Sequence, residues 1–227
     1  MTLRFPVAPM KATMGSTSAI PEGDDWAFEI KWDGYRTVVH LAGGRVRRQS
    51  TAGPDVTDRW PEFGGLAAEV NASSAILDAE LVGFDDDGRP SYELAQRSGA
   101  GSSREAVLQF FDVLQIDGTD TLDLAYVDRR RLLDGLVEPG ENWTVPAYRL
   151  GGGAALVAAS AEQRLEGVIA KRVGSLYRPG TRSTDWRKIK NRTRVELTIG
   201  GFSAGAGNRS STFGALLIGR RDGERLG

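Results

Sequence analysis

Short apolar runs punctuated by glycine recur along most of the chain. Alternating or β-branched runs predict strands over residues 24–34, 35–44, 44–51, 75–85, 108–118, 166–173, 185–192, 195–202 and 213–221. Apolar residues at helical spacing predict short helices over residues 60–70, 91–98, 127–140 and 155–165. The first three strands are predicted to form a meander with a turn at Gly43–Gly44.

Strands that alternate with short helices predict an α+β fold with largely antiparallel sheets. The last two predicted strands flank a glycine-rich loop, and an isolated two-stranded hairpin is only marginally stable in water. We therefore expect a main domain over residues 1–192. Residues 193–227 are expected either to pack on that domain or to begin a second domain that is cut short.

Composition narrows the classes of function. The chain has 227 residues, 26% of them charged, with a formal net charge of −1, so any nucleic-acid surface has to be a local patch. The absence of cysteine excludes disulfides, thiol catalysis and cysteine-based zinc sites, and fits a reducing cytosol. No apolar segment has the length of a signal peptide or a membrane span, so we expect no membrane association.

Lysine is scarce among the basic residues. Only five of the 29 are lysines: Lys11, Lys31, Lys171, Lys188 and Lys190. An arginine stays protonated in proteins, whereas the pKa of a lysine can fall until the amine is a nucleophile. A chain this sparing with lysine is expected to keep one where arginine cannot substitute, although a GC-rich coding bias explains the arginines equally well.

Charged residues two apart in predicted strands share one face of a sheet. This places Glu29 and Asp33 on the face of Lys31, and it pairs Asp78 with Glu80 and Lys188 with Lys190. Cations for phosphate oxygens and carboxylates for Mg²⁺ are what polyphosphate chemistry requires. For each pair alone, a solvated charged strand face is the simpler interpretation.

Five segments in order resemble the motifs of the covalent nucleotidyltransferases, which comprise ATP-dependent DNA ligases with RNA ligases and mRNA-capping enzymes as relatives. The sequence KWDGYR (residues 31–36) resembles K-x-D-G-x-R, LDAE (77–80) resembles L-D-G-E, FFDVL (110–114) an F-D-hydrophobic motif, EGVIAK (166–171) E-G-V-V-A-K, and WRKIK (186–190) W-x-K-x-K. The motifs cover most of residues 7 to 192. The sequence around them is most similar to that of the bacterial end-joining ligases.

The resemblance implies a nucleotidyltransferase (ATP-grasp-like) fold of antiparallel sheets flanked by short helices. It implies that Lys31 attacks ATP and becomes a lysyl-AMP. It also implies that Glu29 lies beside the adenine, that Phe111 stacks on the adenine, and that Arg36 and Glu80 contact the ribose. The phosphates would be bound by Lys171, Lys188 and Lys190. Mg²⁺ or Mn²⁺ would be held by Glu80 and Glu166. By strand alternation, one of Phe110 and Phe111 must face the core. Neither Glu29 nor Asp33 is expected to rest tightly on Lys31 in the reactive complex, because a carboxylate would stabilise the ammonium form.

Two departures from the family pattern bear on activity. The family's S-R-x-G segment is Ser50-Thr51-Ala52-Gly53 here, so Thr51 replaces a charged nucleotide contact with one hydroxyl, for which Arg47 or Arg48 could compensate. After Arg192 about 35 residues remain, enough for the first hairpin of the oligonucleotide-binding (OB) barrel that follows in the family. We therefore expect a shortened ligase with an incomplete OB-fold hairpin.

Three functions follow from these observations. The first is the adenylation module of an ATP-dependent DNA ligase, which uses ATP and Mg²⁺ on nicked or broken duplex DNA. Such a module is expected to be a monomer in the bacterial cytoplasm, associated with the nucleoid and with end-joining proteins such as a Ku-type partner. The alternatives are a catalytically impaired remnant that binds nucleotide or DNA, and an RNA ligase or capping-type nucleotidyltransferase.

Overall fold

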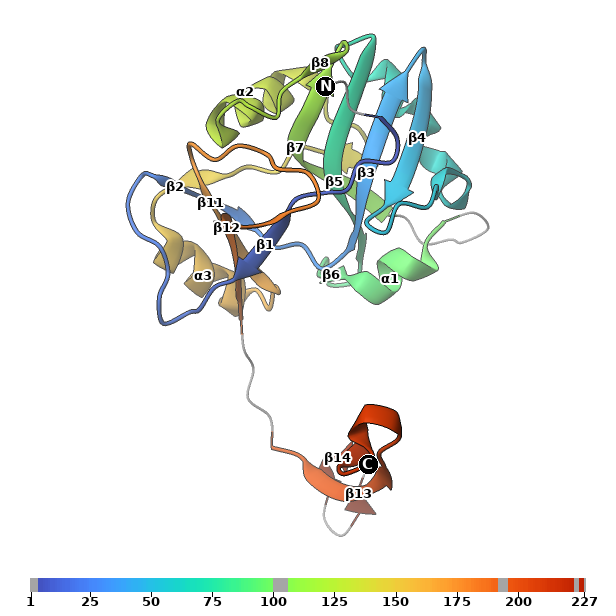
Figure 1. Ribbon diagram of the computed structural model, residues 1–227, viewed down its shortest axis with the longest axis vertical. Helices are drawn as coiled ribbons and strands as arrows, with labels where there is room; N and C mark the ends of the chain where they lie inside the picture. The colour runs from blue at the N-terminus through green and yellow to red at the C-terminus, as the bar shows by residue number, and fades with distance from the viewer. Residues whose placement is uncertain (1–3, 100–105, 192–195, 223–224, 227) are drawn as a thin grey trace. The chain divides into compact units, whose positions relative to one another are not determined.

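The chain divides into two compact units, Met1–Asn191 and Arg192–Gly227. The computed structural model describes residues 4–99, 106–191, 196–222 and 225–226 (Figure 1). The predicted domain boundary at residues 192–193 lies outside the described residues. Each unit is therefore considered by itself.

The first unit contains two sheets. The strand order of the smaller sheet is β1 (Lys11–Met14), β12 (Arg182–Lys190), β11 (Gly167–Arg172), β2 (Trp26–Ile30) and β10 (Arg149–Leu150). Only the β1–β12 pair among these is parallel. This sheet brings the N-terminal segment beside strands from the end of the unit.

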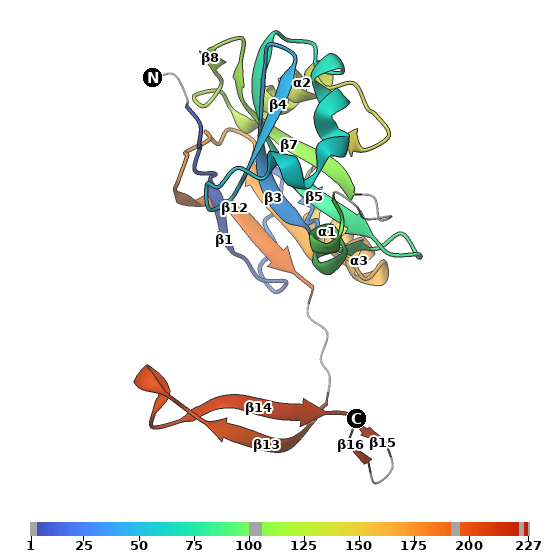
Figure 2. The same ribbon diagram turned by 90° about the vertical axis from the view of Figure 1, so that its right-hand side faces the viewer.

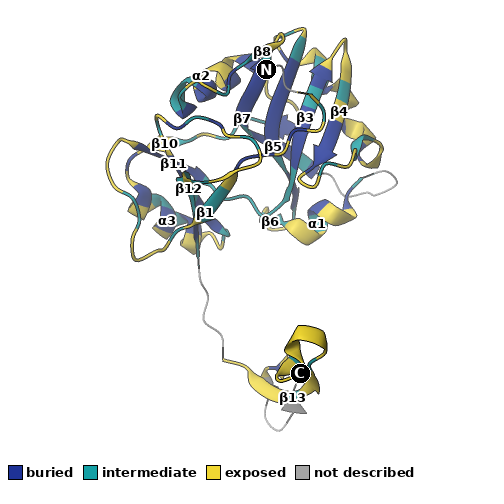
Figure 3. Cartoon of the chain, in the orientation of Figure 1, coloured by how far each residue is buried: buried dark blue, intermediate teal, exposed yellow. Residues whose placement is uncertain are grey.

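The larger sheet has the central order β4 (Arg45–Ser50), β3 (Tyr35–Ala42), β5 (Ser74–Phe84), β7 (Ala106–Ile116) and β8 (Thr119–Asp120). At its margins β6 (Pro90–Ser91) pairs with β5, and β9 (Trp143–Thr144) pairs with β7. The middle strands β3, β5 and β7 are largely buried (Figure 3). The predicted turn is confirmed, because both Gly43 and Gly44 have the positive φ that a two-residue β3–β4 turn requires.

Few helices cover these sheets. They are α1 (Tyr92–Arg97), α2 (Tyr126–Leu136) and α3 (Gly153–Glu162), with 3₁₀ turns η1 (Thr57–Arg59) and η2 (Pro61–Ala68). Helix α2 packs on β7 and α3 on β11 (Figures 1 and 2). The helix predicted over residues 60–70 is the 3₁₀ segment η2, and its adjacent Gly64 and Gly65 disfavour a regular α-helix.

One predicted element is placed wrongly by the sequence pattern. The meander does not form, because β2 joins the smaller sheet while β3 and β4 belong to the larger one. Strand β2 ends at Ile30, so residues 31–34 connect the two sheets instead of continuing the strand. At the end of this connection a side chain on Gly34 would place its Cβ 2.4 Å from the carbonyl oxygen of Leu81. The close passage between the sheets therefore requires glycine.

The second unit contains two short hairpins. Strand β13 (Thr198–Ala204) pairs with β14 (Phe213–Gly219), and β15 (Arg221–Asp222) pairs with β16 (Arg225–Leu226) (Figure 2). The turn between β13 and β14 includes η3 (Gly207–Arg209). The first hairpin exposes large apolar side chains, including Ile199, Phe202 and Leu217.

Overall, the predicted α+β class with mainly antiparallel sheets and few helices is confirmed. Among the described residues, no helix is both long and apolar enough to cross a membrane.

Candidate active site

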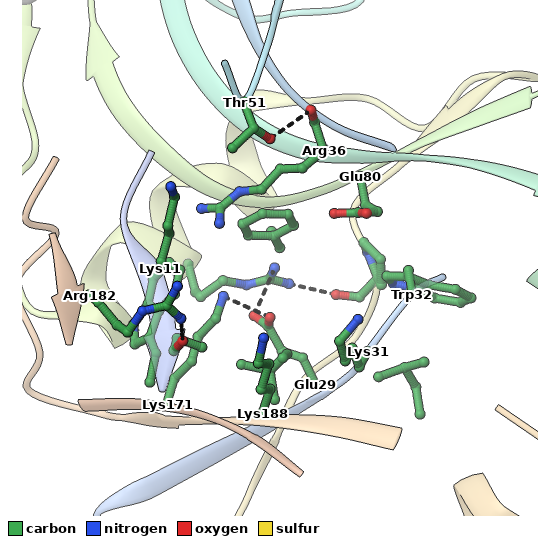
Figure 4. A pocket seen from close by; sticks show the side chains of 17 residues that line it. Lys11, Glu29, Lys31, Trp32, Arg36, Thr51, Glu80, Lys171, Arg182 and Lys188 are labelled. Carbon is green, nitrogen blue, oxygen red and sulfur yellow. Dashed lines mark hydrogen bonds and ion pairs between the residues drawn. The ribbon is translucent and has the colours of Figure 1, made fainter. Parts of the chain in front are cut away.

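A cavity of about 310 Å³ is lined by residues from both sheets of the first unit (Figure 4). Of the residues predicted for a nucleotide site, those that line it are Glu29, Lys31, Arg36, Thr51, Glu80, Phe111, Lys171 and Lys188. These positions come from six segments spread over most of the unit. The fold therefore brings together nearly all of the predicted site.

Lys31 lies at the start of the connection between the sheets. Its backbone N–H donates to the carbonyl oxygen of Gly167 at 2.9 Å, which extends the pairing of β2 with β11 by one bond. Its ammonium group forms an ion pair with Glu166. The other oxygen of Glu166 lies 2.6 Å from Nζ of Lys190. Glu166 and Lys190 are thus joined to the cavity through Lys31.

The charge state of Glu166 follows from these contacts. Burial opposes its ionisation, but the hydrogen bonds from Lys190 and Lys31 outweigh burial and lower the pKa of the carboxyl group. Glu166 is therefore an anion between two ammonium groups.

Glu29 lines the same cavity as Lys31, as the predicted strand face implies, but other groups hold its carboxylate. Its carboxylate is 7% exposed and accepts a hydrogen bond from the hydroxyl of Tyr126. Nζ of Lys171 lies 2.7 Å from one oxygen, and Nη1 of Arg130 lies 3.6 Å from the other. These three groups on α2 and β11 hold Glu29 in this structure, and its separation from Lys31 in the reactive complex stays a prediction.

Tyr126 and Arg130 were missed by the sequence analysis. Both lie on α2, where Arg129 and Arg130 are buried although arginine side chains are mostly exposed in proteins. The buried positions Tyr126, Arg129, Arg130 and Leu133 follow helical spacing. The helical spacing of these positions could have predicted a buried face of α2 if arginine had been counted as a residue that can be buried.

Lys171 occupies a different place from the other predicted phosphate contacts. Its side chain is 2% exposed, and Nζ lies 4.7 Å from the ring centroid of Phe111 and 4.3 Å from that of Trp186. Burial lowers its pKa, although Glu29 opposes that effect. The ammonium group thus lies beside aromatic rings and Glu29, and not beside Glu166 and Lys190.

The two neighbouring phenylalanines of β7 point to opposite sides, as alternation requires. Phe110 is fully buried in the core of the larger sheet. Phe111 lines the cavity, and the guanidinium carbon of Arg36 lies 5.3 Å from its ring centroid. The sequence left open which of the two faces the core, and the structure assigns that place to Phe110.

Arg36 is fixed by a buried carboxylate. Nε and Nη2 bind the two oxygens of Asp78 at 3.0 and 2.6 Å, and the hydroxyl of Tyr177 donates to Asp78 at 2.6 Å. Asp78 is fully buried and does not line the cavity, so it positions Arg36 and is not the partner of Glu80 in an exposed pair.

Glu80 faces the cavity opposite Arg36 in the β3–β5 register. Burial raises the pKa of its carboxyl group to about 8, although Arg36 and Lys31 favour the ionised form. A carboxyl group with this pKa is mostly uncharged at neutral pH.

Thr51 lines the cavity without a charged substitute from β4. Its hydroxyl donates to the carbonyl oxygen of Arg36 at 3.4 Å. Arg48 is buried and donates to carbonyl oxygens of the 3₁₀ segments, while Arg47 pairs with Asp55 at 2.6 Å. The hypothesis that Arg47 or Arg48 compensates for Thr51 is therefore wrong.

Carboxylates for a metal ion are few in this cavity. Within the described ranges, no group of three or more metal-ligating side chains is gathered. Mg²⁺ keeps several waters and commonly uses one or two carboxylates together with substrate phosphates. Glu80 and Glu166, which lie close enough to influence each other's charge, fit that requirement.

Similarity to known proteins agrees with this arrangement. Residues 9–190 match a family model described as ATP dependent DNA ligase domain. The multifunctional non-homologous end joining DNA repair protein LigD of Mycobacterium tuberculosis is 42% identical over 215 residues, which cover 94% of this chain and 28% of that protein. A probable DNA ligase of Nocardioides sp. is 33% identical over 225 residues, which cover 96% of this chain and 44% of that protein. This chain thus spans less than half the length of either relative.

Two solved structures are similar over nearly the whole chain. The ligase domain of M. tuberculosis LigD has a TM-score of 0.72 and 38% identity, with 97% of this chain and 70% of that chain covered. A mycobacterial DNA ligase D in complex with ATP and MES has a TM-score of 0.74 and 37% identity, with 94% and 67% covered. Motifs, fold and similarity agree, and the chain belongs to the family of ATP-dependent DNA ligase domains.

Proposed function

We propose that this adenylation domain works through a covalent AMP on Lys31. The amine of Lys31 attacks the α-phosphorus of ATP, the bond to the bridging oxygen breaks, and pyrophosphate leaves. A 5′-phosphate oxygen of a nicked strand then attacks the same phosphorus and displaces the lysine. Attack by the neighbouring 3′-hydroxyl finally joins the strands and releases AMP.

The observation that carries this proposal is the place of Lys31 in the cavity. Its amine lies at the junction of the two sheets, and Phe111 lines the same cavity. An aromatic ring stacks on any base, and such stacking is worth about 1–3 kcal/mol. A nucleotide whose base stacks on Phe111 therefore lies in the same cavity as the amine of Lys31.

The remaining side chains suit the parts of ATP. The carboxylate of Glu29 and the ammonium of Lys171 supply an acceptor and a donor near Phe111, which favours contact with the base edge. Arg36 and Glu80 suit the ribose, and Lys188 suits the phosphates with Lys190 nearby. Lys171 is therefore proposed for the base and not for the phosphates.

Proton loss from Lys31 requires release from Glu166. The ion pair holds the amine as an ammonium, so it has to separate before attack. We propose that Glu80 and Glu166 hold Mg²⁺ or Mn²⁺, which when bound neutralises charge on the phosphates.

We further propose that the second unit is the beginning of an OB-fold domain. Its exposed apolar side chains, such as Phe202 and Leu217, support a role as part of a larger sheet. The names of the LigD relatives support action in end joining and DNA repair. We propose broken duplex DNA as the substrate and a Ku-type protein as a partner. A monomer associated with the bacterial nucleoid in the cytoplasm fits such a substrate.

The test is formation of a covalent adduct. The purified chain is mixed with ATP and Mg²⁺, and its intact mass is measured alongside Lys31→Ala and Lys31→Arg. We expect an AMP adduct in the wild type and none in either variant. A wild type that binds ATP without forming an adduct would instead support an impaired remnant, which the uncharged Thr51 favours. An adduct with GTP alone would contradict adenylation.

A further inference from the structure

A buried tyrosine outside the five motifs contacts the carboxylate that holds Arg36. Tyr177 lies on the loop between β11 and β12 and is 2% exposed. Its hydroxyl donates to Oδ2 of Asp78 at 2.6 Å and accepts from the backbone N–H of Met10 at 3.0 Å. Burial and the charge of Asp78 raise the pKa of Tyr177 well above its ordinary value, so the hydroxyl stays a donor. The loop joins two strands of the smaller sheet and Asp78 lies on β5, so this hydroxyl links the two sheets.

The ring and backbone of Tyr177 are held by groups that do not use its hydroxyl. The ring makes a T-shaped contact with Trp186, with centroids 5.6 Å apart. The guanidinium carbon of Arg129 lies 5.7 Å from the centroid of the tyrosine ring. The backbone N–H of Tyr177 donates to the carbonyl oxygen of Leu122 at 3.0 Å. Removal of the hydroxyl alone is therefore expected to leave the loop in place.

The orientation of Asp78 depends on this hydroxyl. Oδ1 accepts from Nε of Arg36, whereas Oδ2 accepts from both Nη2 of Arg36 and the hydroxyl of Tyr177. Asp78 is fully buried, so water cannot easily replace a lost donor. The plane of the carboxylate also sets the plane of the guanidinium, because the two groups form a bidentate pair. A carboxylate that turns after losing the hydroxyl would turn Arg36 with it.

Arg36 keeps donors that can reach a ligand. A guanidinium has five N–H donors, and Asp78 uses two of those of Arg36. The side chain of Arg36 lines the cavity and is 19% exposed, and Glu80 lies opposite it in the β3–β5 register. The direction of the remaining donors into the cavity is therefore set from behind, by Asp78 and the hydroxyl of Tyr177.

We propose that Tyr177 is a positioning residue for the nucleotide: its hydroxyl orients Asp78, and Asp78 orients Arg36 toward the ribose. Tyr177 is not among the residues that line the cavity, so it acts through this pair and does not touch the nucleotide. The inference deepens the proposed function and rests on its assignment of Arg36 to the ribose. A hydroxyl with this role matters more for binding ATP than for binding an analogue that lacks a ribose hydroxyl.

The test compares the whole chain with its Tyr177→Phe variant, in EDTA so that no adduct accumulates. Affinities are measured by titration calorimetry for ATP, 2′-deoxy-ATP and 3′-deoxy-ATP. Tyr126→Phe is the matched control, because its hydroxyl is also buried and donates to a carboxylate, that of Glu29, at another part of the cavity. A cooperative unfolding transition establishes that each variant is folded. If Tyr177→Phe does not fold, Asp78→Asn takes its place and is expected to show the same loss of preference.

We expect Tyr177→Phe to lower the preference for ATP over at least one deoxy analogue about fivefold or more. Tyr126→Phe is expected to change the affinities for all three nucleotides by the same factor. In an Arg36→Lys background, Tyr177→Phe should not change the preference further, because its effect is transmitted through Arg36. A preference that stays at the wild-type value in Tyr177→Phe, falls equally in Tyr126→Phe, or is absent from the wild type would overturn the inference.

Failure of this inference is distinguishable from failure of the proposed function. An adduct on Lys31 together with an unchanged preference in Tyr177→Phe would overturn the role of Tyr177 alone. A preference that is lost in Tyr177→Phe, in a chain that forms no adduct with ATP and Mg²⁺, would overturn the proposed function and support the role of Tyr177.

Discussion

At the residue scale, Phe110 and Phe111 point to opposite sides of β7, so that Phe111 lines the cavity while Phe110 lies in the core. Replacing Phe111 with leucine removes the ring proposed to stack on the base, so we expect ATP affinity to fall by about 1–3 kcal/mol, or roughly 5- to 150-fold. Thermal stability is expected to change little because Phe111 is only half-buried. Titration calorimetry and thermal unfolding measure the two quantities.

The neighbouring residue provides the matched control. Phe110→Leu alters the fully buried core, so it should lower the free energy of unfolding while leaving ATP affinity nearly unchanged. The stacking role is refuted if the two variants lose the same affinity.

A second residue-scale prediction concerns Glu80 in the absence of nucleotide and metal. Its pKa is raised from an ordinary 4.5 to about 8, so the fold favours the uncharged form. This contribution to stability is fully present below pH 4.5 and is lost as the pH rises through 8. Glu80→Gln stays uncharged throughout. Relative to this variant, wild type should lose roughly 5 kcal/mol of unfolding free energy across that window, since each pKa unit between 4.5 and 8 corresponds to about 1.4 kcal/mol.

Chemical denaturation at several pH values measures this difference. Parallel pH profiles for wild type and Glu80→Gln would contradict the assignment. Asp85→Asn, at an exposed turn between β5 and β6, is a suitable control for the loss of a carboxylate.

Residue types and spacing were enough to predict eight of the 17 residues that line the cavity. Lys31, Arg36, Glu80, Phe111 and Lys188 all line it, as the motifs implied. Sequence patterns do not predict which arginines lie on a buried helix face, because their burial depends on carboxylates and carbonyl groups supplied by distant segments. The same limit applies to Tyr177, whose contact with Asp78 joins positions that are 99 residues apart.

At the element scale, α2 is joined to β7 by a buried ion pair. Nε and Nη2 of Arg129 bind the two oxygens of Asp112 at 2.7 and 3.0 Å, and both side chains are fully buried. Arg129→Met leaves a buried carboxylate unpaired, so we expect a loss of about 3–5 kcal/mol of unfolding free energy. The double variant Arg129→Met/Asp112→Leu should recover part of that loss.

An exposed arginine of the same helix is the control. Arg131 pairs with Asp128 at 2.7 Å, with 70% of the arginine side chain exposed. Arg131→Met should cost less than about 1 kcal/mol. Equal losses for the two single variants in denaturant titrations would contradict a special role for the buried pair.

Most elements were predicted in the right order and type, because their apolar spacing is regular. The exceptions are the helix predicted over residues 60–70, which is the 3₁₀ segment η2, and strand β2, whose sheet could not be assigned from its own residues. Four of its five side chains are buried, so it lacks the one-sided pattern that marks neighbours in a meander. Its partner β11 lies well over a hundred residues further along the chain.

At the scale of the whole molecule, the first unit carries the complete cavity. Both sheets contribute to it, and the connection at residues 31–34 places the proposed nucleophile where they meet. The residues proposed for the first step all lie within Met1–Asn191.

The most direct measurement is the position of the bound AMP. Wild-type chain is incubated with ATP and Mg²⁺, digested, and its peptides are sequenced by mass spectrometry under conditions that preserve a phosphoramide. We predict AMP on the Lys31 side chain alone, lost after acid treatment. AMP attached to Lys171, Lys188 or Lys190, or noncovalent ATP binding with no modified peptide, would contradict the account.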